Sequence, residues 1–126
     1  MKTIETSGKI WTLRSDLENI THWSSDWCCS DGDSVELYVE KDKSGFELRC
    51  FSGIPGSKIW VDSIDFNTLW LKVCQDKNYT SISNIEFFKK TFEEQSIILA
   101  DWLCSKFCEF NDGFYSAPSE GKGIIC

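Results

Sequence analysis

The single imidazole of this sequence belongs to His22, which lies shortly before the adjacent thiols of Cys28 and Cys29. An imidazole beside a thiol can act as the general base for a nucleophilic cysteine, so these residues could form the centre of a small cysteine-dependent enzyme. Their closeness in sequence defines no geometry, and the simpler interpretation of His22 is a partly buried helical residue. We therefore expect no catalytic residues and no enzyme activity.

Four thiols could also bind a metal. Cys104 and Cys108 are spaced to share one face of a helix, and with Cys28 and Cys29 they could hold a zinc ion. No Cys-x-x-Cys knuckle is present, so small core residues are the favoured interpretation of Cys104 and Cys108. The segment 53–58 (GIPGSK) lacks the spacing of a phosphate-binding loop and is expected to be a turn. We expect no metal and no cofactor.

Acidic and aromatic side chains recur together in two parts of the sequence, an irregular segment at 24–34 and the strands of an expected sheet. Large aromatic rings bury much area with few rotors, and carboxylates attract a basic partner, so this combination favours a protein-binding surface. The residues expected to bind a partner are Asp26, Trp27, Asp31, Asp33, Tyr38, Trp60, Asp62 and Trp70. A solvated loop is the simpler alternative for the first group.

The elements that would position these residues follow from the spacing of apolar residues. Alternation predicts a strand at 9–13, a hairpin over 35–50, and two further strands at 59–62 and 69–74. Ser15-x-x-Glu18 has the pattern of a capping box and predicts a short helix after the first strand, with Leu17, Ile20 and Trp23 on its buried side.

From residue 83 onward the apolar period changes to about 3.6, which predicts a C-terminal helical region. It contains two capping boxes, Ser83-x-x-Glu86 and Thr91-x-x-Glu94, so a break between two helices is expected near Thr91. Residues 116–126 are expected to form a flexible tail. The sequence thus predicts one α+β domain over 1–126: an antiparallel β-meander of about four to five strands, a C-terminal helix or helix pair packed on one face, and a short N-terminal helix.

Strict alternation gives the expected sheet two unlike faces. One is aliphatic and suited to receive the helices, and the other carries aromatic and charged residues. The aromatic face includes Tyr38, Trp60 and Trp70. Two interpretations remain open, because the predicted first helix could cover this face as a second small core or leave it exposed to a partner.

The charge balance bears on the kind of partner. Thirteen Lys and Arg against twenty Asp and Glu give a net charge of −7, which disfavours direct binding to nucleic acid or to an anionic membrane and favours a basic protein. Solubility alone is the alternative reason for such a charge. The N-terminal sequence contains no apolar run typical of a signal peptide or a membrane span, so we expect a cytoplasmic protein with reduced cysteines.

In size and acidic composition the chain resembles bacterial immunity proteins in general character, although no motif carries the resemblance. It implies an antitoxin-like inhibitor that blocks a toxin domain such as a nuclease. One alternative is a phage-encoded anti-defence inhibitor or nucleic-acid mimic, which would have the same acidic surface. The cysteine-dependent enzyme is the other.

Overall fold

A computed structural model describes residues 2–6, 9–26, 34–50, 57–77, 79 and 82–111. These residues form a six-stranded antiparallel meander in which each strand pairs with the next along the chain. The strands are β1 (Thr3–Thr6), β2 (Lys9–Asp16), β3 (Ile20–Asp26), β4 (Ser34–Glu40), β5 (Gly45–Cys50) and β6 (Ser57–Asp62). A 3-10 turn, η1 (Ser63–Asp65), then leads into the helices α1 (Phe66–Gln75), α2 (Asn84–Lys89) and α3 (Phe92–Asn111). The predicted α+β class is confirmed, but the meander has six strands where about four to five were expected.

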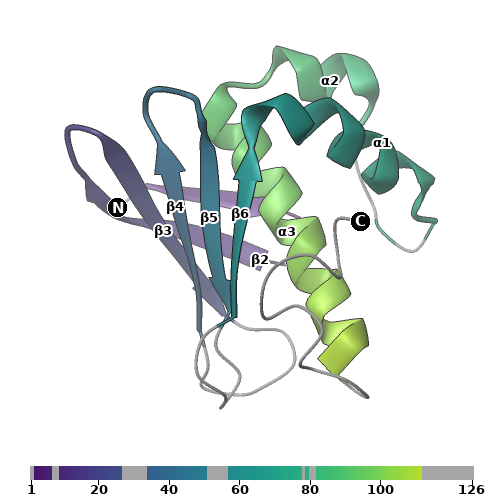
Figure 1. The fold of residues 1–126 in the computed structure, drawn as a ribbon, viewed down its shortest axis with the longest axis horizontal. Helices are drawn as coiled ribbons and strands as arrows, with labels where there is room; N and C mark the ends of the chain where they lie inside the picture. Colours follow the sequence, from purple (N-terminus) through teal and green to yellow (C-terminus); the bar gives the residue numbers. More distant parts are fainter. Residues whose placement is uncertain are drawn as a thin grey trace.

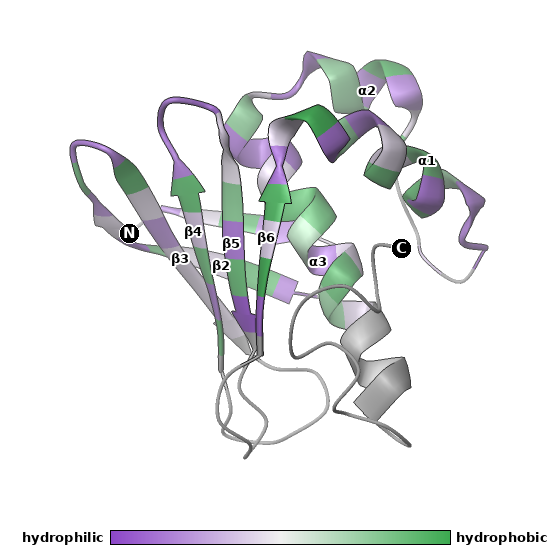
Figure 2. Ribbon diagram, viewed as in Figure 1, coloured by the Kyte–Doolittle hydropathy of each residue, from purple (hydrophilic) through white to green (hydrophobic). Residues whose placement is uncertain are grey.

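The sheet twists strongly, so that β2 runs across the picture in Figure 1 while β4 to β6 run from top to bottom. The long helix α3 contacts β1, β4 and β5, and it also contacts α1. One hydrophobic core lies between the sheet and the helices. Hydrophobic and hydrophilic residues alternate along β4, β5 and β6 (Figure 2), which is the pattern of a sheet with one buried face.

The hairpin of β4 and β5 forms as predicted, with Leu37 opposite Leu48 and Val39 opposite Phe46. The aliphatic face expected from alternation is buried. Its members in these strands and in β6 are exposed by no more than 3%: Val35, Leu37, Val39, Phe46, Leu48, Ile59 and Val61. The predicted strand at 59–62 corresponds to β6, and the predicted strand at 9–13 lies within β2.

The predicted N-terminal helix was wrong, because the residues after Asp16 turn back and form β3. Thr21 and Trp23 are both buried on the helical side of the sheet, at the two-residue spacing of a strand. Leu17, expected to be buried, is 57% exposed in the turn. The Ser15-x-x-Glu18 pattern therefore spans the end of a strand and a turn.

The predicted strand at 69–74 was also wrong, because these residues lie in α1. The buried residues of α1 are Phe66, Leu69, Trp70 and Val73, which have the spacing of one helical face. Leu71 lies between them and is 59% exposed. The helical layer therefore contains α1 in addition to the expected C-terminal pair.

The expected break near Thr91 is confirmed, since α2 ends at Lys89 and α3 begins at Phe92. Ser83 and Glu86 form a reciprocal capping box at the start of α2. Thr91 and Glu94 make the same exchange before α3, each backbone N–H donating to the other's side chain at 3.1 Å. The predicted tail, 116–126, lies outside the described residues.

Candidate functional site

The face of the sheet opposite the helices carries the candidate site, and we call it the outer face. Strand pairing arranges its side chains in two rows. In the first row His22 opposes Tyr38, which opposes Glu47, which in turn opposes Trp60. The second row runs through Ser24, Glu36, Arg49 and Lys58 in the same way. The predicted N-terminal helix, which one of the two interpretations placed over this face, does not form, because residues 20–26 are strand β3.

Tyr38 lies at the centre of the outer face and is held on two sides. The ring of His22 stacks on it with a centroid separation of 4.5 Å and an interplanar angle of 7°. The guanidinium of Arg49 lies over the same ring, 4.7 Å from its centroid. Cross-strand contacts of this kind stabilise a sheet and order the side chains that make them.

Two carboxylates complete this network. Glu36 Oε1 lies 2.6 Å from His22 Nε2, and Glu47 Oε1 lies 2.9 Å from both Nε and Nη2 of Arg49. All four side chains are between about a fifth and a third exposed. The result is a surface of partly buried, mutually fixed polar groups around one aromatic ring, which would lose little conformational entropy when a partner docks.

Trp60 extends the outer face at the last strand and is 48% exposed. Its ring lies beside Gly45 of β5, where an added Cβ would come 2.7 Å from the ring carbon Cζ2. The same Cβ would lie 2.2 Å from the carbonyl oxygen of Val61. Glycine at position 45 therefore makes room for both the strand pairing and the indole ring.

Of the remaining predicted residues, Asp62 lies at the end of β6 and Trp70 lies in the helical layer. Asp62 ends β6 and caps η1, because its Oδ1 accepts the backbone N–H of Ile64 at 3.0 Å. Trp70 does not belong to the sheet: it is 1% exposed in α1, stacks on Phe87 with centroids 4.0 Å apart and donates its indole N–H to Asn84 at 2.8 Å. Trp70 is a core residue in this structure, so it is not part of the outer face.

The predicted loop residues are only partly within the structure. Asp26 is the last residue of β3, and Trp27, Asp31 and Asp33 lie outside the described residues. The structure instead adds His22 to the outer face. The sequence feature that indicates this position is the two-residue spacing of Thr21 and Trp23. In a strand with both of these side chains buried, His22 lies between them and points to the opposite face.

At the outer face the imidazole of His22 is paired with a carboxylate. Among the described residues, the hydrogen-bond partner of the His22 ring is the Glu36 carboxylate and not a hydroxyl or thiol nucleophile. Cys28 and Cys29 lie outside the described residues. Cys104 is buried in the core, as expected for a small packing residue, and the side chain of Cys108 is not described. Within the described part of the chain, no three His, Cys, Asp or Glu side chains are grouped to hold a metal ion.

Two ionisable groups with raised pKa values, Tyr79 and Asp101, are paired on the helical side of the sheet. Tyr79 donates its hydroxyl to Asp101 Oδ2 at 2.5 Å. Burial raises the pKa of Tyr79, and the negative charge of Asp101 raises it further. Burial also raises the pKa of Asp101, and the hydrogen bond from Tyr79 offsets part of that rise. The pair links the segment before α2 to α3, which is a structural role.

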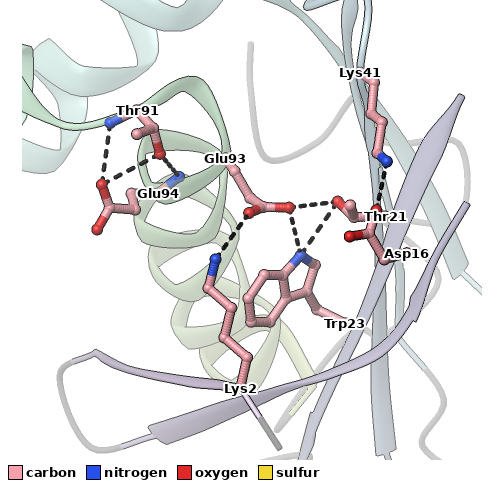
Figure 3. Close-up of polar contacts among 8 residues, drawn as sticks. All are labelled: Lys2, Asp16, Thr21, Trp23, Lys41, Thr91, Glu93 and Glu94. Atoms are coloured by element: carbon pink, nitrogen blue, oxygen red, sulfur yellow. Dashed lines mark hydrogen bonds and ion pairs between the residues drawn. The ribbon is translucent and has the colours of Figure 1, made fainter. Parts of the chain in front are cut away.

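A groove of about 800 Å³ lies between the start of α3, strand β1 and the sheet edge where β3 begins and β4 ends. Figure 3 shows that Glu93 reaches from α3 to the sheet there. Its Oε2 accepts from Thr21 Oγ1 at 2.6 Å and from Trp23 Nε1 at 3.1 Å, and its Oε1 lies 3.8 Å from the ammonium of Lys2. These contacts satisfy a carboxylate and a buried indole N–H, so Glu93 joins the helix to the sheet.

Comparison with known proteins finds no match to a family model, to a curated protein or to a solved structure. The functional argument therefore depends on the residues of this chain. None of the described helices has the length and apolarity needed to cross a bilayer.

Proposed function

We propose that this protein acts by binding another protein through the outer face of its sheet. The observation that carries the proposal is the composition of that face, where Trp60, Tyr38 and Arg49 lie on adjacent strands. Trp, Tyr and Arg are the residue types most enriched at the energetic centres of protein interfaces. Tyr38 and Arg49 are held by neighbours and are therefore ordered before a partner arrives. Trp60 is about half exposed and is therefore accessible to a partner.

A basic protein is the partner that the charge balance favours. The net charge of −7 gives the molecule a long-range attraction for positive surfaces. Glu36 and Glu47 of the outer face each lie beside a cation or an imidazole of the same chain, so the overall charge, more than these two carboxylates, would steer the encounter. Association should therefore slow as salt is added.

The activity that we propose is neutralisation of a toxin domain, such as a nuclease, by an immunity protein in the bacterial cytoplasm. A basic enzyme that binds nucleic acid presents a positive surface, and a small acidic protein with a rigid aromatic centre can cover it without catalysis of its own. This proposal follows from the charge and the outer face together and assigns no catalytic residue.

The experiment is a growth assay in which this protein is co-expressed with the product of the adjacent open reading frame. Rescue from toxicity, followed by co-purification of the two proteins, supports the proposal. The Trp60→Ala variant should lose rescue, whereas Leu71→Ala should retain it, because Leu71 is comparably exposed but lies on α1. Circular dichroism of both variants checks that they fold.

A harmless neighbour, or a toxic neighbour that is not rescued, contradicts the immunity role. Loss of rescue by both alanine variants, with both folded, contradicts the assignment to the outer face. Arg49→Ala provides a second probe of the face that does not alter β6.

A further inference from the structure

The edge of β6 that faces away from β5 is open among the described residues. In the described strand order β6 pairs only with β5, so its other edge carries backbone groups without a strand beside them. Open edges of this kind are templates for pairing with another chain, and proteins commonly protect them. The opposite edge strand, β1, is short at four residues and contacts α3, whereas β6 has six.

The register of β5 and β6 identifies which backbone groups face outward. Gly45 opposes Asp62 and Phe46 opposes Val61, and the N–H of Ser63 donates to the carbonyl of Ser44 at 2.9 Å. Hydrogen-bonded and non-hydrogen-bonded pairs alternate along an antiparallel ladder. Val61 and Ile59 therefore bond to β5. The outward groups are the N–H and C=O of Lys58 and Trp60 and the N–H of Asp62, because the C=O of Asp62 accepts the first hydrogen bond of η1.

We propose that two copies of this chain associate through their β6 edges, antiparallel and about a two-fold axis beside Trp60. In this register Trp60 lies opposite Trp60 of the second copy, and Lys58 lies opposite Asp62 of the second copy. The symmetry repeats the second contact, so two Lys–Asp pairs flank the central tryptophans. All of these side chains lie on the outer face, as face matching between paired strands requires.

The charges of β6 select this register over its neighbours. A shift that centres the axis on Lys58 places two lysines opposite each other, and one that centres it on Asp62 does the same with two carboxylates. Intermediate shifts place Trp60 opposite Lys58 or Asp62 and leave the remaining charges without a partner. Opposite charges directly across an antiparallel pair stabilise it, and like charges destabilise it. The charges of two antiparallel β6 strands are thus complementary only in the register centred on Trp60.

The strand β1 has no comparable arrangement. Pairing of two β1 strands about Glu5 would place two carboxylates opposite each other, and pairing about Ile4 would place Glu5 opposite Thr3. The β6 dimer would instead join the two sheets edge to edge into one sheet. The two outer faces would then form one continuous face with the two Trp60 rings at its centre. It goes beyond the proposed function, because it concerns the strand edge and a second copy of the same chain.

The test uses charge reversal at exposed positions. Analytical ultracentrifugation of the wild-type protein over a range of concentrations should show a monomer–dimer equilibrium. Lys58→Glu should weaken the dimer about tenfold, because each pair becomes carboxylate against carboxylate. Lys89→Glu makes the same change of charge on α2 and should leave the equilibrium unchanged.

A mixture of two variants makes the test specific. Lys58→Glu and Asp62→Lys each place like charges opposite each other in their homodimers, but a mixed dimer of the two has an opposite pair on both sides of the axis. The mixture should therefore dimerise more strongly than either variant alone. Lys58 is exposed, so its variant should fold; Asp62 caps η1, so circular dichroism must confirm the fold of Asp62→Lys.

The proposal is overturned if the protein is monomeric at every concentration up to about 1 mM, because a dimer with a dissociation constant below that value would be detected. Equal effects of Lys58→Glu and Lys89→Glu also overturn it, as does failure of two folded variants to form the mixed dimer. If Asp62→Lys does not fold, the comparison of Lys58→Glu with Lys89→Glu decides the question.

Discussion

Replacement of Glu93 by alanine should destabilise the domain more than any other change of a partly exposed acid. Glu93 accepts hydrogen bonds from Thr21 at 2.6 Å and from Trp23 at 3.1 Å, and these donors are 7% and 0% exposed. Without the carboxylate, the Trp23 N–H keeps only a contact of 3.3 Å to Thr21 Oγ1. Hydrogen bonds to charged groups contribute about 1.5–3 kcal/mol each, so the loss of two coupled bonds should cost about 2–4 kcal/mol.

Urea unfolding followed by circular dichroism measures this cost as a lower midpoint at an unchanged slope. Glu93→Gln keeps an acceptor of the same shape and should cost roughly half as much. Lys2→Ala is the matched control, because it leaves both hydrogen bonds to Glu93 in place. It removes the exposed ion pair to Glu93 and the contact of the Lys2 ammonium with the Trp23 ring, and should cost no more than about 1 kcal/mol. A loss below about 1 kcal/mol for Glu93→Ala, or an equal loss for Lys2→Ala, would refute the role of Glu93 as the link between α3 and the sheet.

Two further predictions concern the core and the β5 turn. Folding raises the pKa of Asp101 above its unfolded value near 3.8, so its contribution to stability is fully present below that value and is lost as the pH rises through the folded pKa. Wild type should therefore lose stability relative to Asp101→Asn as the pH rises above about 3.8, by about 1.4 kcal/mol for each unit of the pKa rise, and parallel urea midpoints would contradict this. Gly45→Ala should cost about 2 kcal/mol or more, because its Cβ would lie 2.2 Å from the Val61 carbonyl oxygen. Lys43→Gly, at a φ of 66° in the same turn, should be neutral or stabilising, and an equal loss at both positions in thermal unfolding would contradict the steric argument.

Local patterns predicted those parts of the fold in which one residue spacing was unambiguous. The hairpin of β4 and β5 has strict alternation on both strands, and the capping boxes at Ser83 and Thr91 each satisfy a helix start with residues close in sequence. These features depend on neighbours within a few positions. The sequence alone was sufficient for them.

Two elements were misassigned because a short pattern has more than one physical solution. Ser15-x-x-Glu18 suits a helix cap, but the period of Thr21 and Trp23 favours a strand, and burial of a large indole against α3 outweighs a local cap. The segment 69–74 excludes Phe66, the residue that completes the helical spacing of α1. Propensity over six residues does not separate a strand from a helix.

The candidate site was predictable in part for the same reason. Alternation alone places Tyr38 and Trp60 on one face, and both lie there. The contact of His22 with Glu36 depends on the register between β3 and β4, which no local pattern specifies once β3 is taken for a helix. Trp70 was assigned to the face through the same error that made α1 a strand.

The dissociation rate of the complex with the partner identified by growth rescue tests the central claim most directly. It is measured by surface binding kinetics for wild type, Trp60→Ala and Leu71→Ala. If the outer face is the binding surface, Trp60→Ala should accelerate dissociation by about 30-fold or more, which corresponds to about 2 kcal/mol, and Leu71→Ala should leave the rate unchanged. Equal rates for wild type and a folded Trp60→Ala variant, or faster dissociation only for Leu71→Ala, would contradict the claim and assign binding to the helical side.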